Sequence, residues 1–449
     1  MEFLSVPLPE KIVSYESEGA FEKATREIDF QLSLSLPSML RERLLWERER
    51  LRRIRDNYIF TVDRAFEILD SELSDFTRGE FDELKKGGYL DFMVIDGEEF
   101  YEKRFDKNML FARNEYEKRL KEKDTDRDKK KELLQTQIDR LISERVPATF
   151  RIRARSSINA RVPVGDKGEY LKCWLPIARP GDQVANVKIL GTSQKKYFLA
   201  PSDAPQRTIY MEAPVGEVNF SVEFEYEISE ISTSIDPFSI RPVDSARFHN
   251  YLCEQAPHIL FTPFLKNLAS EIAGNERNPY YIAKSFYDWI CDNIRYSFMS
   301  EYALYGNLSE FAASNMRGDC GLKALLFMTL CRIKGIPSRW QSGWYATPVG
   351  ASPHDWAFFW IEPYGWVPVD GSFGGARKDI PAYREFYFGN LDAYRMVANS
   401  AFMAPLTPPK RFYRFDPYDN QTGEIETNLR PIRSGEKEHA LEILDFERI

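Results

Sequence analysis

A strictly alternating stretch near the middle of the chain limits the folds available to it. Six apolar residues alternate one by one with polar residues: Val218, Phe220, Val222, Phe224, Tyr226 and Ile228. Because successive side chains of a strand point to opposite faces, the pattern predicts a strand of an antiparallel sheet with one buried face. Turn sequences separate the neighbouring short strands at Val164–Asp166, Pro180–Asp182 and Pro201–Asp203. We therefore expect a β-sandwich over residues 148–235.

Residues 1–147 have the period of helices and carry many charges. Of the eighteen residues from Glu115 to Glu132, all but three are charged. We interpret this run as the solvated face of a helix or helical hairpin, and a surface that contacts a partner or a second copy of the chain is the alternative. Within the region, Phe92–Tyr101 predicts a small hairpin that turns at Asp96-Gly97.

Helical and extended patterns follow one another in residues 236–400. Pro263 and Pro279 stand at the first positions of two predicted helices, and Asn278 precedes the second as a capping residue. A third helix is predicted over residues 316–336, followed by strands over 338–347, 354–361 and 364–370. Residues 401–449 are expected to form a proline-containing, irregular extension. The expected fold class is α+β.

Composition argues against several classes of function. With 61 basic and 69 acidic residues the net charge is −8, which disfavours general nucleic-acid binding. No run of 18 apolar residues occurs and the first residues lack the features of a signal peptide, so we expect no membrane association and a cytoplasmic location. The five cysteines are dispersed, as reduced thiols are.

A metal site is not expected. His249, Cys253 and His258 are close in sequence, but their spacing offers at most two ligands on one helical face. No motif indicates another cofactor. We therefore interpret these three residues as ordinary side chains near a domain junction.

The residues that indicate chemistry begin at Cys320. This cysteine follows Arg317-Gly318-Asp319 and precedes the apolar run Gly321–Met328, which places it at the first turn of a buried helix. The positive end of the helix dipole lowers the pKa of a thiol from about 8.5 and favours the nucleophilic thiolate. The alternative is one more buried structural cysteine.

A histidine and an aspartate follow on two predicted strands. His354 begins one strand, and Asp370 ends the next, which is reached through the turn Glu362–Gly365. An antiparallel hairpin of this length brings Asp370 beside His354. A carboxylate in that position fixes the tautomer of the imidazole while the other ring nitrogen takes a thiol proton.

Together these motifs resemble the transglutaminase-like superfamily. The resemblance is carried by Gly-Asp-Cys-Gly at 318–321, by residues 331–339 and 343–344, by His354-Asp355-Trp356 and by Tyr364–Asp370. It covers residues 255–390 well and residues 148–232 weakly, as the β-sandwich that often precedes the core in bacterial members. The resemblance implies a papain-like core in residues 236–400, with a helix packed on an antiparallel sheet.

The resemblance also implies roles for single residues. Cys320 would be the nucleophile, His354 the general base and acid, and Asp370 the carboxylate that orients the histidine. The backbone N–H of Cys320 would be one donor to the oxyanion. Asp355 replaces the small residue usual after the histidine, and alternation along the strand predicts that its side chain leaves on the opposite face without disturbing the triad. The calcium sites of animal enzymes and the zinc CxxC pairs of the peptide N-glycanase branch are not recognisable.

The activity implied is hydrolysis of a peptide or other amide bond through a thioester on Cys320, with a protein or peptide as substrate. A crosslinking acyltransferase that passes the acyl group to an amine is the second hypothesis, and a non-catalytic binding module on the same fold is the third. Trp344, Trp356 and Trp366 are candidates for lining the substrate cleft, and core packing of the sheet is the alternative role for them.

Overall fold

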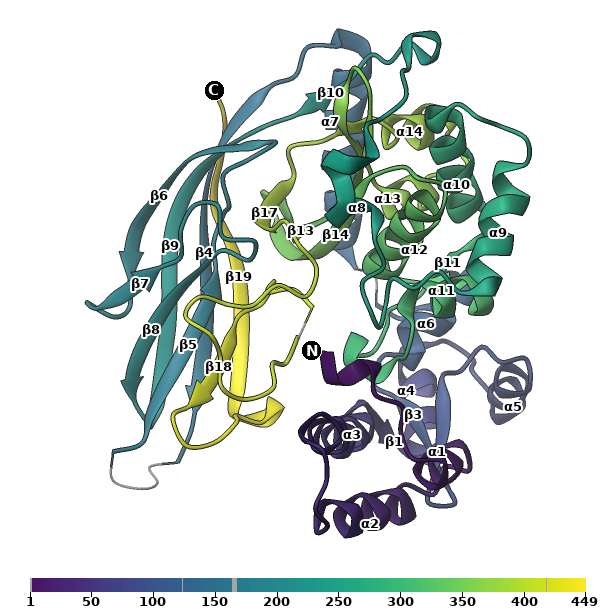
Figure 1. The fold of residues 1–449 in the computed structure, drawn as a ribbon, viewed down its shortest axis with the longest axis vertical. Helices are drawn as coiled ribbons and strands as arrows, with labels where there is room; N and C mark the ends of the chain where they lie inside the picture. The colour runs from purple at the N-terminus through teal and green to yellow at the C-terminus, as the bar shows by residue number, and fades with distance from the viewer. Residues whose placement is uncertain (1, 123, 164–167, 417) are drawn as a thin grey trace. The chain divides into compact units, whose positions relative to one another are not determined.

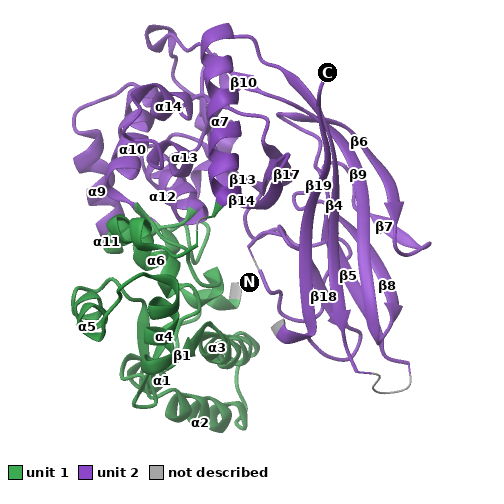
Figure 2. Cartoon of the chain, turned by 180° about the vertical axis from the view of Figure 1, so that it is seen from behind, with its two compact units in different colours: residues 1–124, 254–260, 295–319 green, residues 125–253, 261–294, 320–449 purple. Residues whose placement is uncertain are grey.

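The computed structural model describes residues 2–122, 124–163, 168–416 and 418–449, and these form two compact units (Figure 2). Unit 1 comprises residues 1–124, 254–260 and 295–319, and unit 2 comprises residues 125–253, 261–294 and 320–449. This grouping differs from the division expected from sequence, because residues 125–147 go with unit 2 and residues 295–319 go with the N-terminal helices. The predicted turn at Val164–Asp166 lies outside the described residues.

Unit 1 is mainly helical. Its elements are α1 (Glu10–Ser17), α2 (Phe21–Leu32), α3 (Ser38–Asn57), β1 (Tyr58–Phe60), α4 (Val62–Glu72), α5 (Arg78–Lys86), β2 (Phe92–Ile95), β3 (Glu98–Glu102), α6 (Phe105–Ala112), β11 (Arg295–Tyr296), α11 (Leu308–Asn315) and β12 (Arg317–Gly318). Strands β2 and β3 pair antiparallel, and the residues between them, Asp96 and Gly97, have φ of 51° and 91°. The hairpin expected at this place is therefore confirmed.

The first part of unit 2 is a sandwich of two four-stranded sheets. It follows helix α7 (Thr125–Glu144), and its strands are β4 (Thr149–Arg161), β5 (Tyr170–Pro176), β6 (Val184–Thr192), β7 (Tyr197–Leu199), β8 (Thr208–Pro214), β9 (Glu217–Ser229), β18 (Glu424–Thr427) and β19 (Lys437–Arg448). The sheets have the orders β19-β4-β9-β6 and β18-β5-β8-β7, and apolar side chains of both form one core. In β9 every second residue from Phe220 to Ile228 is buried, as the alternation predicts.

The C-terminal residues complete both sheets of this sandwich. Strand β18 pairs with β5, and β19 pairs along the length of β4, as Figure 1 shows with β19 in yellow. Most side chains of β19 are exposed and many are charged, so the apolar pattern that would predict a strand is weak. Ion pairs across the two strands, such as Arg155–Glu442 at 3.3 Å, match the charges of β19 to those of β4.

The second part of unit 2 packs helices on a four-stranded sheet. Its elements are β10 (Ile231–Ser232), α8 (His249–Leu252), α9 (Pro263–Ala273), α10 (Pro279–Asn293), α12 (Cys320–Ile333), β13 (Ser338–Thr347), β14 (Gly350–Ile361), β15 (Gly365–Val369), α13 (Gly371–Gly375), α14 (Pro381–Phe386), β16 (Asn390–Leu391) and β17 (Arg395–Asn399). The sheet has the order β15-β14-β13-β17, and the fold is α+β. The proline starts of α9 and α10 lie where the sequence predicts them, and Asn278 caps α10 through its side chain.

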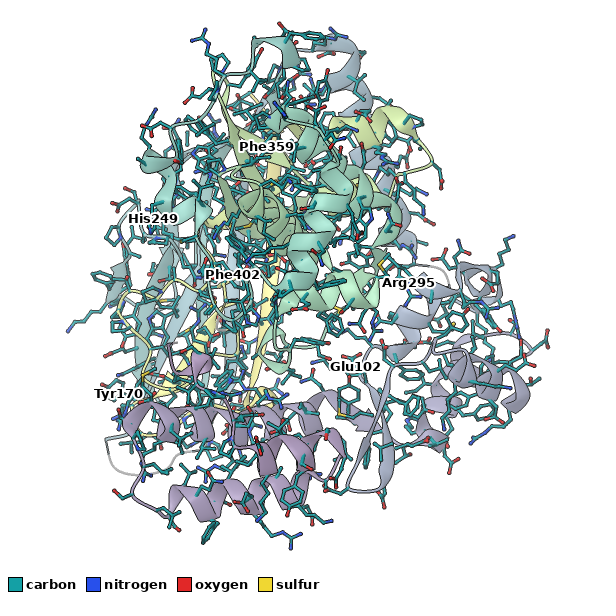
Figure 3. The ribbon with its side chains drawn as sticks, turned by 45° about the vertical axis from the view of Figure 1, so that its right-hand side comes forward. Glu102, Tyr170, His249, Arg295, Phe359 and Phe402 are labelled. Atoms are coloured by element: carbon teal, nitrogen blue, oxygen red, sulfur yellow. The ribbon has the colours of Figure 1, made fainter. Side chains whose placement is uncertain are left out.

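Helix α12 is buried between α9, α10, α13 and strand β14. Every residue from Gly321 to Arg332 is buried, whereas Cys320 at the start of the helix is partly exposed. On β14, Phe359 (labelled in Figure 3) packs against Phe327 of α12 with ring centroids 5.9 Å apart. The opposite face of β14 carries Trp356 and Phe358, which belong to the core of the sandwich. No helix among the described residues combines the length and apolar character that crossing a bilayer requires.

Candidate functional site

Cys320 differs from the buried cysteines of the chain in its surroundings. It lies at the first residue of α12 and is partly exposed. Cys173, Cys291 and Cys331 are buried, and burial raises the pKa of each thiol, to about 12 for Cys291. A thiol that remains protonated is a poor nucleophile, so these three are unsuited to attack a carbonyl carbon.

His354 and Asp370 form the contact that the hairpin predicts. The register of β14 and β15 pairs Ala357 with Val369, and this places Asp370 at the end of β15 on the His354 side. The Nε2 atom of His354 lies 2.8 Å from Oδ2 of Asp370, and both side chains are almost fully buried. With Nε2 engaged by the carboxylate, Nδ1 is the ring nitrogen left to take a proton from a thiol.

Asp370 is held on both of its oxygens. Its Oδ1 accepts hydrogen bonds from the backbone N–H groups of Ser372 (3.1 Å) and Phe373 (2.9 Å), and so caps α13. Its Oδ2 accepts from His354 and from Nη2 of Arg395, the latter at 3.0 Å. Burial acts to raise the pKa of Asp370, but the charges of His354 and Arg395 outweigh it and hold the pKa well below its usual value. The carboxylate is therefore ionised whenever the protein is folded near neutral pH.

Arg395 is a residue of the site that the sequence analysis missed. It is fully buried at the start of β17, and its Nη2 also donates to Asp392 Oδ2 at 3.0 Å. Its guanidinium lies 4.7 Å from the ring centroid of Trp356. Strand β17 comes close because β13 has a glycine there: a Cβ on Gly343 would stand 1.8 Å from the carbonyl oxygen of Met396. The one available signal was the arginine that precedes the apolar residues Met396, Val397 and Ala398.

Aromatic rings fix the orientation of the imidazole. The ring of His354 stacks with Phe373 at a centroid distance of 4.3 Å and an interplanar angle of 22°. It also stacks with Trp356 at 5.8 Å and 28°. These contacts and the bond to Asp370 limit rotation of the ring, which a general base needs in order to meet its proton in one geometry.

The position of Asp355 corrects an expectation from sequence. Its side chain does leave β14 on the face opposite His354, but that is the face on which α12 lies. The Sγ atom of Cys320 donates a hydrogen bond to Asp355 Oδ2 at 3.3 Å. Asp355 is therefore a direct neighbour of the sulfur, and alternation alone could not show which face the helix would cover. A contact between Cys320 and the ring of His354 stays a prediction.

The tryptophans proposed for the cleft are integrated into the core. Trp344 and Trp356 are almost fully buried, and their Nε1 atoms donate to Gln421 O and Gln341 Oε1, both at 2.7 Å. Trp366 is partly buried and packs against the same core. These positions fit the packing role that the sequence left open.

His249 and His258, two of the three residues considered for a metal site, lie on different segments of the structure. His249, labelled in Figure 3, begins α8. His258 is buried, and burial lowers its pKa to about 3, so its ring is neutral. Among the residues that the structure describes, no group of three or more His, Cys, Asp or Glu side chains is arranged to hold a metal ion.

Known proteins resemble parts of this chain. A Haemophilus influenzae protein, described as uncharacterized, is 22% identical over 284 residues, which cover 54% of this chain and 76% of that one. A crystal structure from Cytophaga hutchinsonii, named "Putative Cysteine Protease", has a TM-score of 0.43 at 14% identity and covers 68% of this chain and 98% of its own. The periplasmic domain of TgpA from Pseudomonas aeruginosa has a TM-score of 0.28 at 16% identity, with coverages of 54% and 92%.

The family comparison is more specific than these overall similarities. Residues 266–371 match the family model of the transglutaminase-like superfamily. The match contains Cys320, His354 and Asp370, and it includes α12 and the hairpin of β14 and β15. This chain therefore carries a transglutaminase-like domain over residues 266–371.

Proposed function

We propose that the protein is a cysteine-dependent hydrolase that cleaves a peptide or other amide bond through a thioester on Cys320. The observation that supports the proposal is the buried pair of His354 and Asp370, which Arg395 holds in place. The same domain contains Cys320, a partly exposed thiol at the start of a helix. A fold alone does not determine the activity of a protein, so the proposal rests on these side chains.

The proposed reaction has two halves. The Cys320 thiol gives its proton to Nδ1 of His354, and the sulfur attacks the amide carbon to form a tetrahedral intermediate. The C–N bond then breaks as the imidazolium returns that proton to the leaving amine, which leaves a thioester. In the second half His354 takes a proton from water, the hydroxide attacks the thioester carbon, and the thiol is restored as the acid departs. Asp370 stabilises the imidazolium and stays ionised throughout.

The thiols of the chain support a reducing compartment, such as the cytoplasm, as the place of action. None of the five cysteines, all of which lie in the described part of the chain, forms a disulfide in the structure. A nucleophilic cysteine has to stay reduced to act, and partly exposed thiols are readily oxidised outside reducing compartments.

The roles of Cys320 and His354 predict the effect of removing each side chain. We expect the wild-type protein to cleave members of a mixture of tryptic peptides followed by mass spectrometry, and we expect Cys320→Ala and His354→Ala each to reduce the rate by at least about 10³-fold. Cys253→Ala, which removes the other partly exposed cysteine, is the matched control and should keep the activity. Cleavage that persists in Cys320→Ala would contradict the proposal.

Removal of the Arg395 charge should change how kcat/KM falls at acid pH. The pKa of Asp370 is depressed in the folded protein, so its ionisation is lost as the pH falls, and removal of the Arg395 charge moves that loss to higher pH. In Arg395→Met the ionised form of Asp370 should be lost at a higher pH than in the wild type, so kcat/KM near pH 4 should fall roughly tenfold further below its value at pH 7 than it does in the wild type. Arg395→Lys keeps the positive charge, so its pH profile should lie closer to that of the wild type than the profile of Arg395→Met does. A uniform loss of activity at all pH values, with the fall at acid pH unchanged, would mean that Arg395 acts only on the stability of the fold.

The competing acyl acceptor separates a hydrolase from a crosslinking enzyme. Water is present at about 55 M, so hydrolysis dominates unless the site excludes water. We expect a cleaved peptide to carry a new carboxylate even when a primary amine such as glycine ethyl ester is added at millimolar concentration. Mass spectrometry that finds mostly amine-conjugated product under these conditions would favour transfer, with the same residues in the same roles.

A further inference from the structure

The hydrogen bond between Cys320 and Asp355 places a carboxylate directly on the proposed nucleophile. Asp355 is 5% exposed, and its Oδ2 accepts from the Cys320 sulfur at 3.3 Å. Its Oδ1 accepts from Nε2 of Gln421 at 2.7 Å, and the same Nε2 donates to the carbonyl oxygen of His354 at 3.0 Å. Both oxygens of Asp355 thus act as acceptors, which is how an ionised carboxylate bonds.

Two further carboxyl groups, those of Asp419 and Asp416, lie near Asp355. Burial and then the charge of Asp355 raise the pKa of Asp419 to about 7. Burial, followed by the charge of Asp419, raises the pKa of Asp416 well above its usual value. Asp419 is therefore about half protonated at pH 7. Asp355 is the member of this group that bonds the sulfur.

Other charged or titratable groups of the site lie on, or at the ends of, five elements. Strand β14 contributes His354, and the end of β15 contributes Asp370 with Arg395 of β17 bound to it. Helix α12 contributes Lys323, one turn after Cys320 and 3% exposed, and burial lowers the pKa of its amine. Helix α10 contributes Cys291, whose thiol stays protonated because burial raises its pKa to about 12. Asp355 accepts a hydrogen bond from the sulfur itself.

A carboxylate in contact with a thiol opposes loss of the thiol proton. Ionisation of Cys320 in this position would place two negative charges about 3.3 Å apart, and it would also break the S–H···O bond. We propose that Asp355 restrains the nucleophile: it holds Cys320 as a neutral thiol in the resting protein, so that the thiolate forms only when the sulfur leaves this bond and gives its proton to His354. This goes beyond the proposed function, since it concerns the thiol before any substrate is bound.

The test measures the reactivity of Cys320 without a substrate. Each full-length variant is treated with iodoacetamide at pH 7, and the alkylation rate of each cysteine is followed by peptide mass spectrometry. Asp355→Asn keeps the size of the side chain and removes its charge. If this lowers the pKa of the Cys320 thiol by about one unit, the thiolate fraction rises about tenfold, and Cys320 should be alkylated about tenfold faster. Asp203→Asn, which removes an exposed carboxylate in the loop between β7 and β8, should leave the rate unchanged.

A second variant covers the case in which Asp355→Asn does not fold. Asp419 is largely ionised at pH 8 because its pKa is about 7, so Asp419→Asn should raise the alkylation rate of Cys320 at that pH by about twofold to threefold. The proposal is overturned if folded Asp355→Asn reacts at the wild-type rate or more slowly. With Asp355→Asn unfolded, an unchanged rate in Asp419→Asn overturns it equally. Either result leaves the hydrolase proposal to be judged by the peptide-cleavage rates of Cys320→Ala and His354→Ala.

Discussion

The burial of helix α12 determines where the chemistry of this protein can occur. Because the helix is enclosed along its length by α9, α10, α13 and β14, its axis is fixed. The sulfur of Cys320 is thereby brought to β14, the strand that also carries His354 and Asp355. Displacement of the helix by a core substitution would move the proposed nucleophile relative to both of these side chains.

Asp370 fixes the position of His354, as the burial of α12 fixes the position of Cys320. One of its oxygens binds two backbone N–H groups at the start of α13, and the other binds His354 and Arg395. A carboxylate with this many donors keeps its charge despite complete burial, since each donor favours the ionised form. The imidazole is thus oriented by a group whose own position and charge are determined by three different elements, α13, β14 and β17.

The local parts of this arrangement could be predicted from sequence, whereas its long-range parts could not. Helix starts at Pro263 and Pro279, the hairpin at Asp96-Gly97 and the meeting of His354 with Asp370 all follow from residues close in the chain. Arg395 arrives from a strand 25 residues beyond Asp370, and no local pattern indicates which strand lies beside β13. Asp355 leaves its strand on the predicted face, but its contact with Cys320 was not predicted, because alternation gives the face of a side chain and not the element that covers that face. Strand β19 was missed since it is held by backbone pairing and exposed charges.

The central claim is that Cys320 carries the acyl group during turnover, and direct detection of the thioester tests it most closely. The full-length protein would be mixed with a p-nitrophenyl ester of an acylated amino acid, quenched in acid within seconds and digested for mass spectrometry. We expect the acyl mass on the peptide that contains Cys320, and slower formation of that adduct in His354→Ala. An adduct that forms equally fast in His354→Ala, or that lies on another residue, would contradict the claim.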